Sequence, residues 1–144
     1  MTSVLTAAGL AGDRPDLPSF CPHVLLKEEF PTYNAHKITD KVAAGKLAIG
    51  SHVGFDSPLV TEMIAGCGFD FIWIDGEHSA IDRKDIQNHL MACRAAGAAG
   101  IVRVPWNDPV IIKAILDMGA DGIVVPMVCS LEEAKQAAAA THYP

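Results

Sequence analysis

Three ionisable side chains and a glycine follow an apolar segment in the middle of the chain. Residues 69–74 are largely apolar, and Asp75, Gly76, Glu77 and His78 come directly after them. An imidazole titrates near neutral pH, and a carboxylate three residues earlier can accept its other ring N–H, which fixes the tautomer and raises the basicity. We therefore take His78 as a candidate general base and Asp75 as its partner.

Arg103 lies near the end of the next apolar segment, 100–104. A guanidinium binds a carboxylate through two parallel hydrogen bonds that lysine cannot reproduce. Each candidate also has a structural interpretation: His78 could line a turn, Asp75 could cap one, and Arg103 could be an ordinary ion-pair partner. Glu77 could organise the site or could form a surface ion pair with Arg83.

Other side chains that could do chemistry are expected to have structural roles. Trp73 is expected in the core, because it lies inside an apolar segment. The four cysteines form no CxxC pair, so we expect reduced and mostly buried thiols rather than a metal site or a disulfide framework. Packing or surface positions are expected for His52, Cys67, His89 and Cys93.

Apolar segments alternate with helical patterns that are bounded by glycine and by capping residues. The pattern predicts strands at 47–52, 69–75, 100–104 and 122–128, and helices at 39–44, 58–65, 82–96, 108–118 and from 131 onward. Residues 1–36 hold four prolines without sustained periodicity, which predicts an irregular N-terminal arm. We therefore divide the chain into this arm and one domain, 37–144.

Four strand-then-helix units predict an α/β fold with a parallel sheet. No Gly-x-Gly-x-x-Gly follows any strand, which disfavours a dinucleotide-binding fold. Polar side chains at successive strand ends favour the first half of a (β/α)₈ TIM-type barrel, which needs about 250 residues when complete. Strands at the open side of a half-barrel would leave unpaired backbone groups and an uncovered apolar face.

Composition limits the class of partner. The formal charge of −6 over 144 residues, without a cluster of Lys and Arg, argues against nucleic acid. No apolar run approaches the roughly 20 residues that span a bilayer, and residues 1–10 do not resemble a secretory signal, so we expect no membrane and a cytoplasmic location. A small-molecule site is the remaining expectation.

Four blocks of sequence carry a family resemblance. These are 68–78 (GFDFIWIDGEH), 101–105 (IVRVP), 115–120 (ILDMGA) and 125–128 (VPMV). Together they resemble the N-terminal half of the HpcH/HpaI family of metal-dependent 2-keto acid aldolases, to which macrophomate synthase is related. The resemblance implies a modified TIM barrel, a homo-oligomer (trimer or hexamer), and C–C bond cleavage or formation through the metal-bound enolate of pyruvate.

The resemblance also implies roles for residues. His78 would be the base and Asp75 its positioning partner, while Arg103 would hold the carboxylate of a 2-keto acid such as pyruvate; the second substrate would be an aldehyde. A divalent metal (Mg²⁺, Mn²⁺ or Co²⁺) would be held by a Glu and an Asp on later strands, beyond residue 144. This chain alone is therefore expected to be inactive.

Two other functions stay open at this stage. The chain could be a non-catalytic half-barrel that binds a keto acid through Arg103 or interacts with another subunit. Alternatively, it could belong to a different enzyme on the same barrel, one similar to macrophomate synthase or to the β subunit of citrate lyase.

Overall fold

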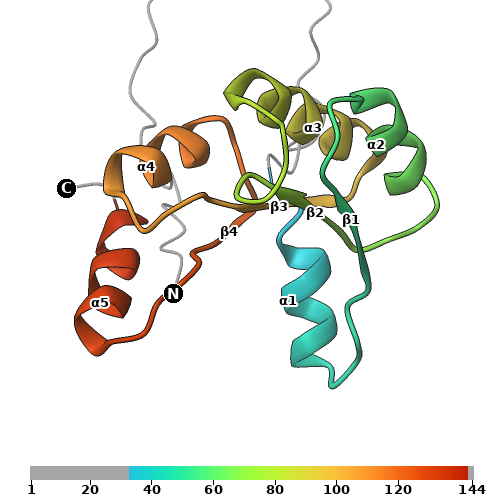
Figure 1. Ribbon diagram of the computed structural model, residues 1–144. Coiled ribbons are helices and arrows are strands. Elements are labelled where there is room, and N and C mark those ends of the chain that lie inside the picture. The colour runs from blue at the N-terminus through green and yellow to red at the C-terminus, as the bar shows by residue number, and fades with distance from the viewer. Residues whose placement is uncertain (1–32, 143–144) are drawn as a thin grey trace, which may run out of the picture. The chain divides into compact units, whose positions relative to one another are not determined.

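The computed structural model describes residues 33–142. Within them, helices and strands alternate along the chain (Figure 1). Most of the predicted irregular arm, 1–36, lies outside the described residues, and α1 begins at the last residue of that range. The elements are α1 His36–Ala43, β1 Gly50–Val53, α2 Pro58–Ala65, β2 Phe71–Asp75, α3 Arg83–Ala96, β3 Ala99–Arg103, α4 Pro109–Asp117, β4 Gly122–Val124 and α5 Leu131–Ala140.

The four strands form one parallel sheet in the order β1-β2-β3-β4. Each strand therefore pairs with the next one along the chain, and a helix follows each strand. A doubly wound sheet would reverse its strand order at a switch point, whereas a barrel adds strands in sequence. The predicted class, an α/β fold with the topology of the first half of a (β/α)₈ barrel, is confirmed.

The hydrophobic core lies between one face of the sheet and the helices α2, α3 and α4 (Figure 1). Alternate strand residues point to this face and are fully buried, among them Val53, Ile72, Ile74 and Val102. Burying one aliphatic side chain of this size stabilises the fold by about 1.5–3 kcal/mol. The helices are therefore held by the apolar side of each strand.

The opposite face of the sheet is less covered. Phe71 and Trp73 of β2 and Ile101 of β3 are only partly buried there. Trp73 was predicted to lie in the core, but it lies on this open face. The guanidinium carbon of Arg103 is 5.9 Å from the centroid of its ring. The prediction failed because an apolar run cannot tell which of the two faces of a strand a helix will cover.

The helices begin and end largely where the sequence predicts. Asp82 and Asp85 form a reciprocal capping box at the start of α3, and Gly97 ends that helix with a left-handed φ of 76°. The side chains of Asp108 and Ser130 accept backbone N–H groups at the starts of α4 and α5. Local capping chemistry is therefore sufficient to place these ends.

The strands differ from prediction mainly at their ends. β1 begins three residues later than predicted, because residues 47–49 precede its first register pair with β2. β4 ends at Val124 instead of 128. Pro126 has no N–H to donate, and Met127 has a φ of 55°, so the ladder cannot continue through them.

Two aspartates form hydrogen bonds with backbone N–H groups at the amino ends of the strands. Asp70 accepts the backbone N–H of Ile49 at 2.8 Å and pairs with Lys41. Asp121 accepts the backbone N–H of Gly100, also at 2.8 Å. In both cases the residue before one strand fixes the start of its neighbour, which holds the register of the sheet from the end opposite to the candidate site.

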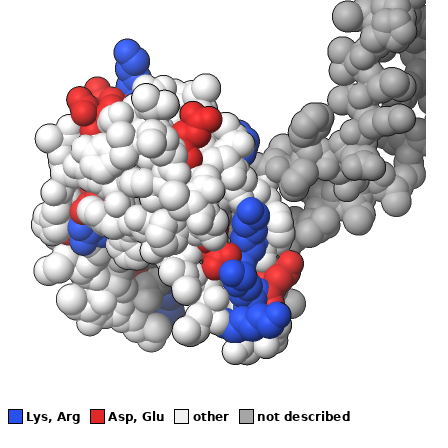
Figure 2. Space-filling model, turned by 90° about the vertical axis from the view of Figure 1, so that its right-hand side faces the viewer, with Lys and Arg blue, Asp and Glu red and all other residues white. Residues whose placement is uncertain are grey.

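The described cysteines, Cys67, Cys93 and Cys129, are free. Only Cys93 is buried, so the prediction of mostly buried thiols is wrong for these three. The described helices include none that is long and apolar enough to cross a membrane. On the side of β1 and α2, Figure 2 shows charged side chains of both signs, and Lys and Arg gather only where Asp and Glu lie beside them.

Candidate active site

The carboxyl ends of β2 and β3 bring Asp75 and Arg103 side by side. The two residues are register partners in the parallel ladder. Arg103 Nε donates to Asp75 Oδ1 at 2.9 Å and Nη2 donates to Oδ2 at 2.5 Å, so the guanidinium holds the carboxylate with two parallel bonds. The side chain of Asp75 is 6% exposed and that of Arg103 is 23% exposed. The Asp75–Arg103 ion pair is therefore largely buried, and the other side chains of the cluster lie around it.

The loop after β2 is fixed by the same two residues. Asp75 Oδ1 accepts the backbone N–H of Glu77 at 3.0 Å and that of His78 at 3.1 Å. The N–H of Gly76 donates to the carbonyl oxygen of Arg103 at 2.9 Å. A Cβ on Gly76 would lie 2.7 Å from that oxygen, so only glycine permits this approach. The turn interpretation of Asp75 is therefore confirmed, since its carboxylate accepts two backbone N–H groups of the loop.

Glu77 belongs to the site. Its Oε2 lies 3.0 Å from Arg103 Nη1, and its Oε1 lies 3.5 Å from His78 Nε2. The ion pair of Glu77 is thus made with Arg103 and not with Arg83. The imidazole of His78 contacts Glu77, whereas Asp75 receives the backbone of His78, so the expected pairing of Asp75 with the ring differs from the structure.

His52 has the surface position expected for it, with a side chain that is 59% exposed, and it also joins the cluster. Its Nε2 lies 3.4 Å from Asp75 Oδ2. His52 is the register partner of Trp73, which lies two residues before Asp75 on the same face of β2. The period of two along a strand could have placed His52 on the face of the site, but not its distance from Asp75.

The guanidinium of Arg103 keeps unused donor capacity. It has five N–H donors, and its contacts with Asp75 and Glu77 use three of them. Two N–H donors are left by these contacts, and a carboxylate bound in a bidentate manner needs two donors. The three groups together carry one excess negative charge, because two carboxylates share one guanidinium.

The electrostatics of the pair favour the ionised forms. The hydrogen bonds from Arg103 hold the pKa of Asp75 well below its usual range, with help from the backbone N–H groups of His78 and Glu77, against the opposing effect of burial. The same contact with Asp75 raises the pKa of Arg103. Both groups therefore stay charged throughout the neutral range.

Acid should destabilise the chain partly through Asp75. Because the pKa of its carboxyl is lower in the folded than in the unfolded chain, its contribution is complete above about pH 4–5 and is lost as the pH falls further. We expect the urea midpoint of the wild type to fall more steeply between about pH 5 and 3 than the urea midpoint of Asp75→Asn. A folded-state pKa below the unfolded value has this effect for an aspartate. Asp40→Asn, which removes an exposed carboxylate, should keep the wild-type slope; equal slopes for all three would refute this role.

The remaining histidine and cysteine predictions concern packing. His89 is fully buried, and its Nδ1 lies 2.8 Å from the hydroxyl of Thr61 between α2 and α3. Burial raises the pKa of the Cys93 thiol to about 12, which makes it a poor nucleophile. Packing roles for His89 and Cys93 are therefore confirmed.

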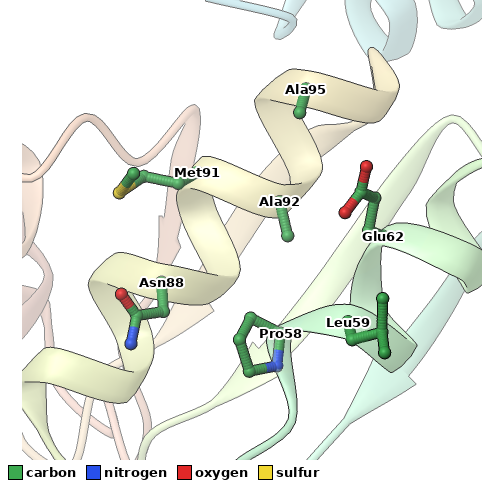
Figure 3. A pocket seen from close by; sticks show the side chains of 7 residues that line it. All are labelled: Pro58, Leu59, Glu62, Asn88, Met91, Ala92 and Ala95. Carbon is green, nitrogen blue, oxygen red and sulfur yellow. The ribbon is translucent and has the colours of Figure 1, made fainter.

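A groove of about 400 Å³ lies between α2 and α3, on the helical layer (Figure 3). Its wall is largely apolar and contains no member of the cluster around Arg103. It is lined by Pro58, Leu59, Glu62, Asn88, Met91, Ala92 and Ala95. The ionisable cluster, in contrast, lies at the carboxyl edge of the sheet, where α/β folds place their sites.

The residues at hand do not fit a metal centre by themselves. Within 33–142, no group of three or more His, Cys, Asp or Glu side chains is placed to hold a metal ion. Asp75 and Glu77, the carboxylates at the site, already face the guanidinium of Arg103.

Comparison with known proteins shows the family of the chain. The family model HpcH/HpaI aldolase/citrate lyase matches residues 49–144. The 4-hydroxy-2-oxo-heptane-1,7-dioate aldolase of Salmonella arizonae is 42% identical over 111 residues, which are 77% of this chain and 41% of that protein. The range that the family model matches, 49–144, includes the whole cluster around Arg103.

Solved structures show the same fold. An HpcH/HpaI aldolase from Desulfitobacterium hafniense DCB-2 superposes with a TM-score of 0.68 at 29% identity, over 74% of this chain and 42% of that one. Macrophomate synthase superposes with a TM-score of 0.62 at 32% identity, over 72% of this chain and 36% of that one. The chain spans less than half the length of each of these relatives. It belongs to the HpcH/HpaI aldolase/citrate lyase family.

Proposed function

We propose that this chain carries the base and the carboxylate clamp of a carbon–carbon lyase that cleaves or forms 4-hydroxy-2-keto acids. The observation that carries the proposal is the placement of Arg103 and His78 on either side of Glu77, at the carboxyl edge of the sheet. The name of the Salmonella relative, a 4-hydroxy-2-oxo acid aldolase, supports the substrate class. The substrates are then a 2-keto acid such as pyruvate and an aldehyde.

Arg103 binds the carboxylate of the keto acid. Asp75 takes two of the five N–H donors of the guanidinium, and two of the others can form charge-assisted hydrogen bonds with the substrate carboxylate. Asp75 is the positioning residue, because it fixes the plane of the guanidinium through two bonds and is itself fixed by two backbone N–H groups. The clamp thus holds the acid in one orientation beside the loop that carries His78.

His78 acts as the general base in the cleavage direction. It accepts the proton of the C4 hydroxyl, the C3–C4 bond breaks, and the aldehyde leaves while the electron pair forms the enolate of pyruvate. Protonation of the enolate at C3 then gives pyruvate, and the reverse sequence forms the bond. The side chain of His78 is 71% exposed, which leaves it accessible to a substrate on the open face.

The test is release of pyruvate from a 4-hydroxy-2-keto acid with added Mg²⁺ or Mn²⁺. It compares this chain with a version continued through the later strands that the longer relatives contain. Activity in the extended protein alone would support a clamp and base that need further residues. Activity in neither protein would refute the proposed function.

A keto-acid-binding protein without catalytic activity is the second candidate. The two N–H donors at Arg103 favour it, since they can bind a carboxylate whether or not a reaction follows. Pyruvate binding by both proteins, with no pyruvate released by either, would support this candidate over the lyase.

A further inference from the structure

Glu77 contacts both the proposed clamp and the proposed base. One of its carboxylate oxygens lies 3.0 Å from Arg103 Nη1, and the other lies 3.5 Å from His78 Nε2. The first distance is that of a charge-assisted hydrogen bond, and the second is about 0.5 Å longer than a good one. In this structure Glu77 therefore interacts strongly with Arg103 and only weakly with His78.

The two carboxylates on Arg103 are held with different strength. Asp75 receives two N–H groups of the guanidinium and two of the backbone, and its side chain is 6% exposed. Glu77 has a single contact with Arg103, and its side chain is 15% exposed. If a third carboxylate enters the cluster, Glu77 is the one that can leave.

Electrostatic repulsion favours the departure of Glu77 from Arg103 when a substrate carboxylate binds. Asp75, Glu77 and Arg103 already carry one excess negative charge, and a substrate carboxylate on the same guanidinium adds another. Like charges within a few ångströms in a partly buried site repel strongly. Transfer of Glu77 away from Arg103 relieves this repulsion, and the imidazole of His78, whose Nε2 lies 3.5 Å from Glu77 Oε1, is placed to receive it.

We propose that the substrate carboxylate displaces Glu77 from Arg103, and that the released Glu77 then pairs with His78. Glu77 is thus a positioning residue that links filling of the clamp to orientation of the base. The inference rests on the proposed function, because it takes Arg103 as the clamp and His78 as the base. It predicts that the wild-type Glu77 weakens substrate binding in order to align the imidazole.

The experiment measures the dissociation constant of pyruvate for the folded chain by NMR titration. Glu77→Gln removes the competing charge and should tighten pyruvate binding by about tenfold. Glu62→Gln removes the same charge from α2, away from the cluster, and should bind pyruvate like the wild type. Circular dichroism confirms folding of each variant, and Glu77→Met, which should also tighten binding, takes the place of Glu77→Gln if that variant unfolds.

A second readout reports on the base. The ¹⁵N resonance of His78 Nε2 should shift when pyruvate binds to the wild type and should stay in place when pyruvate binds to Glu77→Gln. In a protein that turns over substrate, Glu77→Gln should lower both KM and kcat, whereas a purely structural residue would raise KM.

Arg103→Gln distinguishes a failure of the clamp from a failure of the role of Glu77. If it abolishes pyruvate binding while Glu77→Gln binds pyruvate no more tightly than the wild type, the role of Glu77 is refuted and the clamp stands. If Arg103→Gln binds pyruvate like the wild type, the clamp itself is refuted and the inference falls with it. A gain from Glu77→Gln that persists in the double variant with Arg103→Gln would also overturn the inference.

Discussion

Arg103→Lys should raise KM for the keto acid by about 10- to 100-fold, with a smaller change in kcat. The ammonium group keeps the charge but cannot bind Asp75 through two parallel bonds, reach Glu77 and still offer two donors to a substrate. Steady-state kinetics of pyruvate release by the extended protein measures the effect. The substitution also lowers the urea midpoint, because Asp75 loses one of its paired contacts.

A matched control is available on α3. Arg94 is exposed and donates to the carbonyl oxygen of Gly119, away from the candidate site, so Arg94→Lys should leave KM unchanged. If Arg103→Lys had the same KM as this control, Arg103 would be a structural ion-pair partner and no clamp. The comparison separates loss of guanidinium geometry at the site from loss of an arginine in general.

His78→Ala should lower kcat by about 10²–10⁴-fold, which is the usual contribution of a general base. The side chain is 71% exposed, and the hydrogen bond from the backbone of residue 78 to Asp75 does not depend on the imidazole. We therefore expect the same urea midpoint as in the wild type and a dissociation constant for pyruvate close to the wild-type value. Turnover by the extended protein and unfolding in urea check the two parts.

His36→Ala serves as the control for this substitution, because His36 is an exposed histidine at the start of α1. It should keep full turnover. Wild-type turnover in His78→Ala would refute the assignment of the base. His52, whose ring lies beside Asp75, would then be the candidate base.

The structure changes how the site works compared with the sequence interpretation. From the sequence, Asp75 and His78 were expected to form one pair and Arg103 a separate clamp. In the fold, Asp75 pairs with Arg103 and Glu77 lies between Arg103 and His78, so the proposed clamp and the proposed base share one network. The kinetic effects of two substitutions within this network should therefore not simply add.

Local sequence was enough for the type and order of the elements, although not for the start of β1 or the end of β4. Capping residues such as Asp82 and Ser130, a left-handed glycine such as Gly97, and the apolar run before Asp75 act over a few residues, so they can be read directly along the chain. The sequence also placed Asp75, His78 and Arg103 at the ends of strands. It marked the carboxyl edge of the sheet as the candidate site.

Only the tertiary structure decided which of these side chains meet. The parallel register sets Asp75 opposite Arg103, and the close approach of Gly76 to the backbone of Arg103 turns Glu77 toward the guanidinium. The same packing left Trp73 on the open face and brought His52 to Asp75. Such contacts depend on strand register, on which face the helices cover and on distances between different strands, and none of these is encoded within a single segment of the chain.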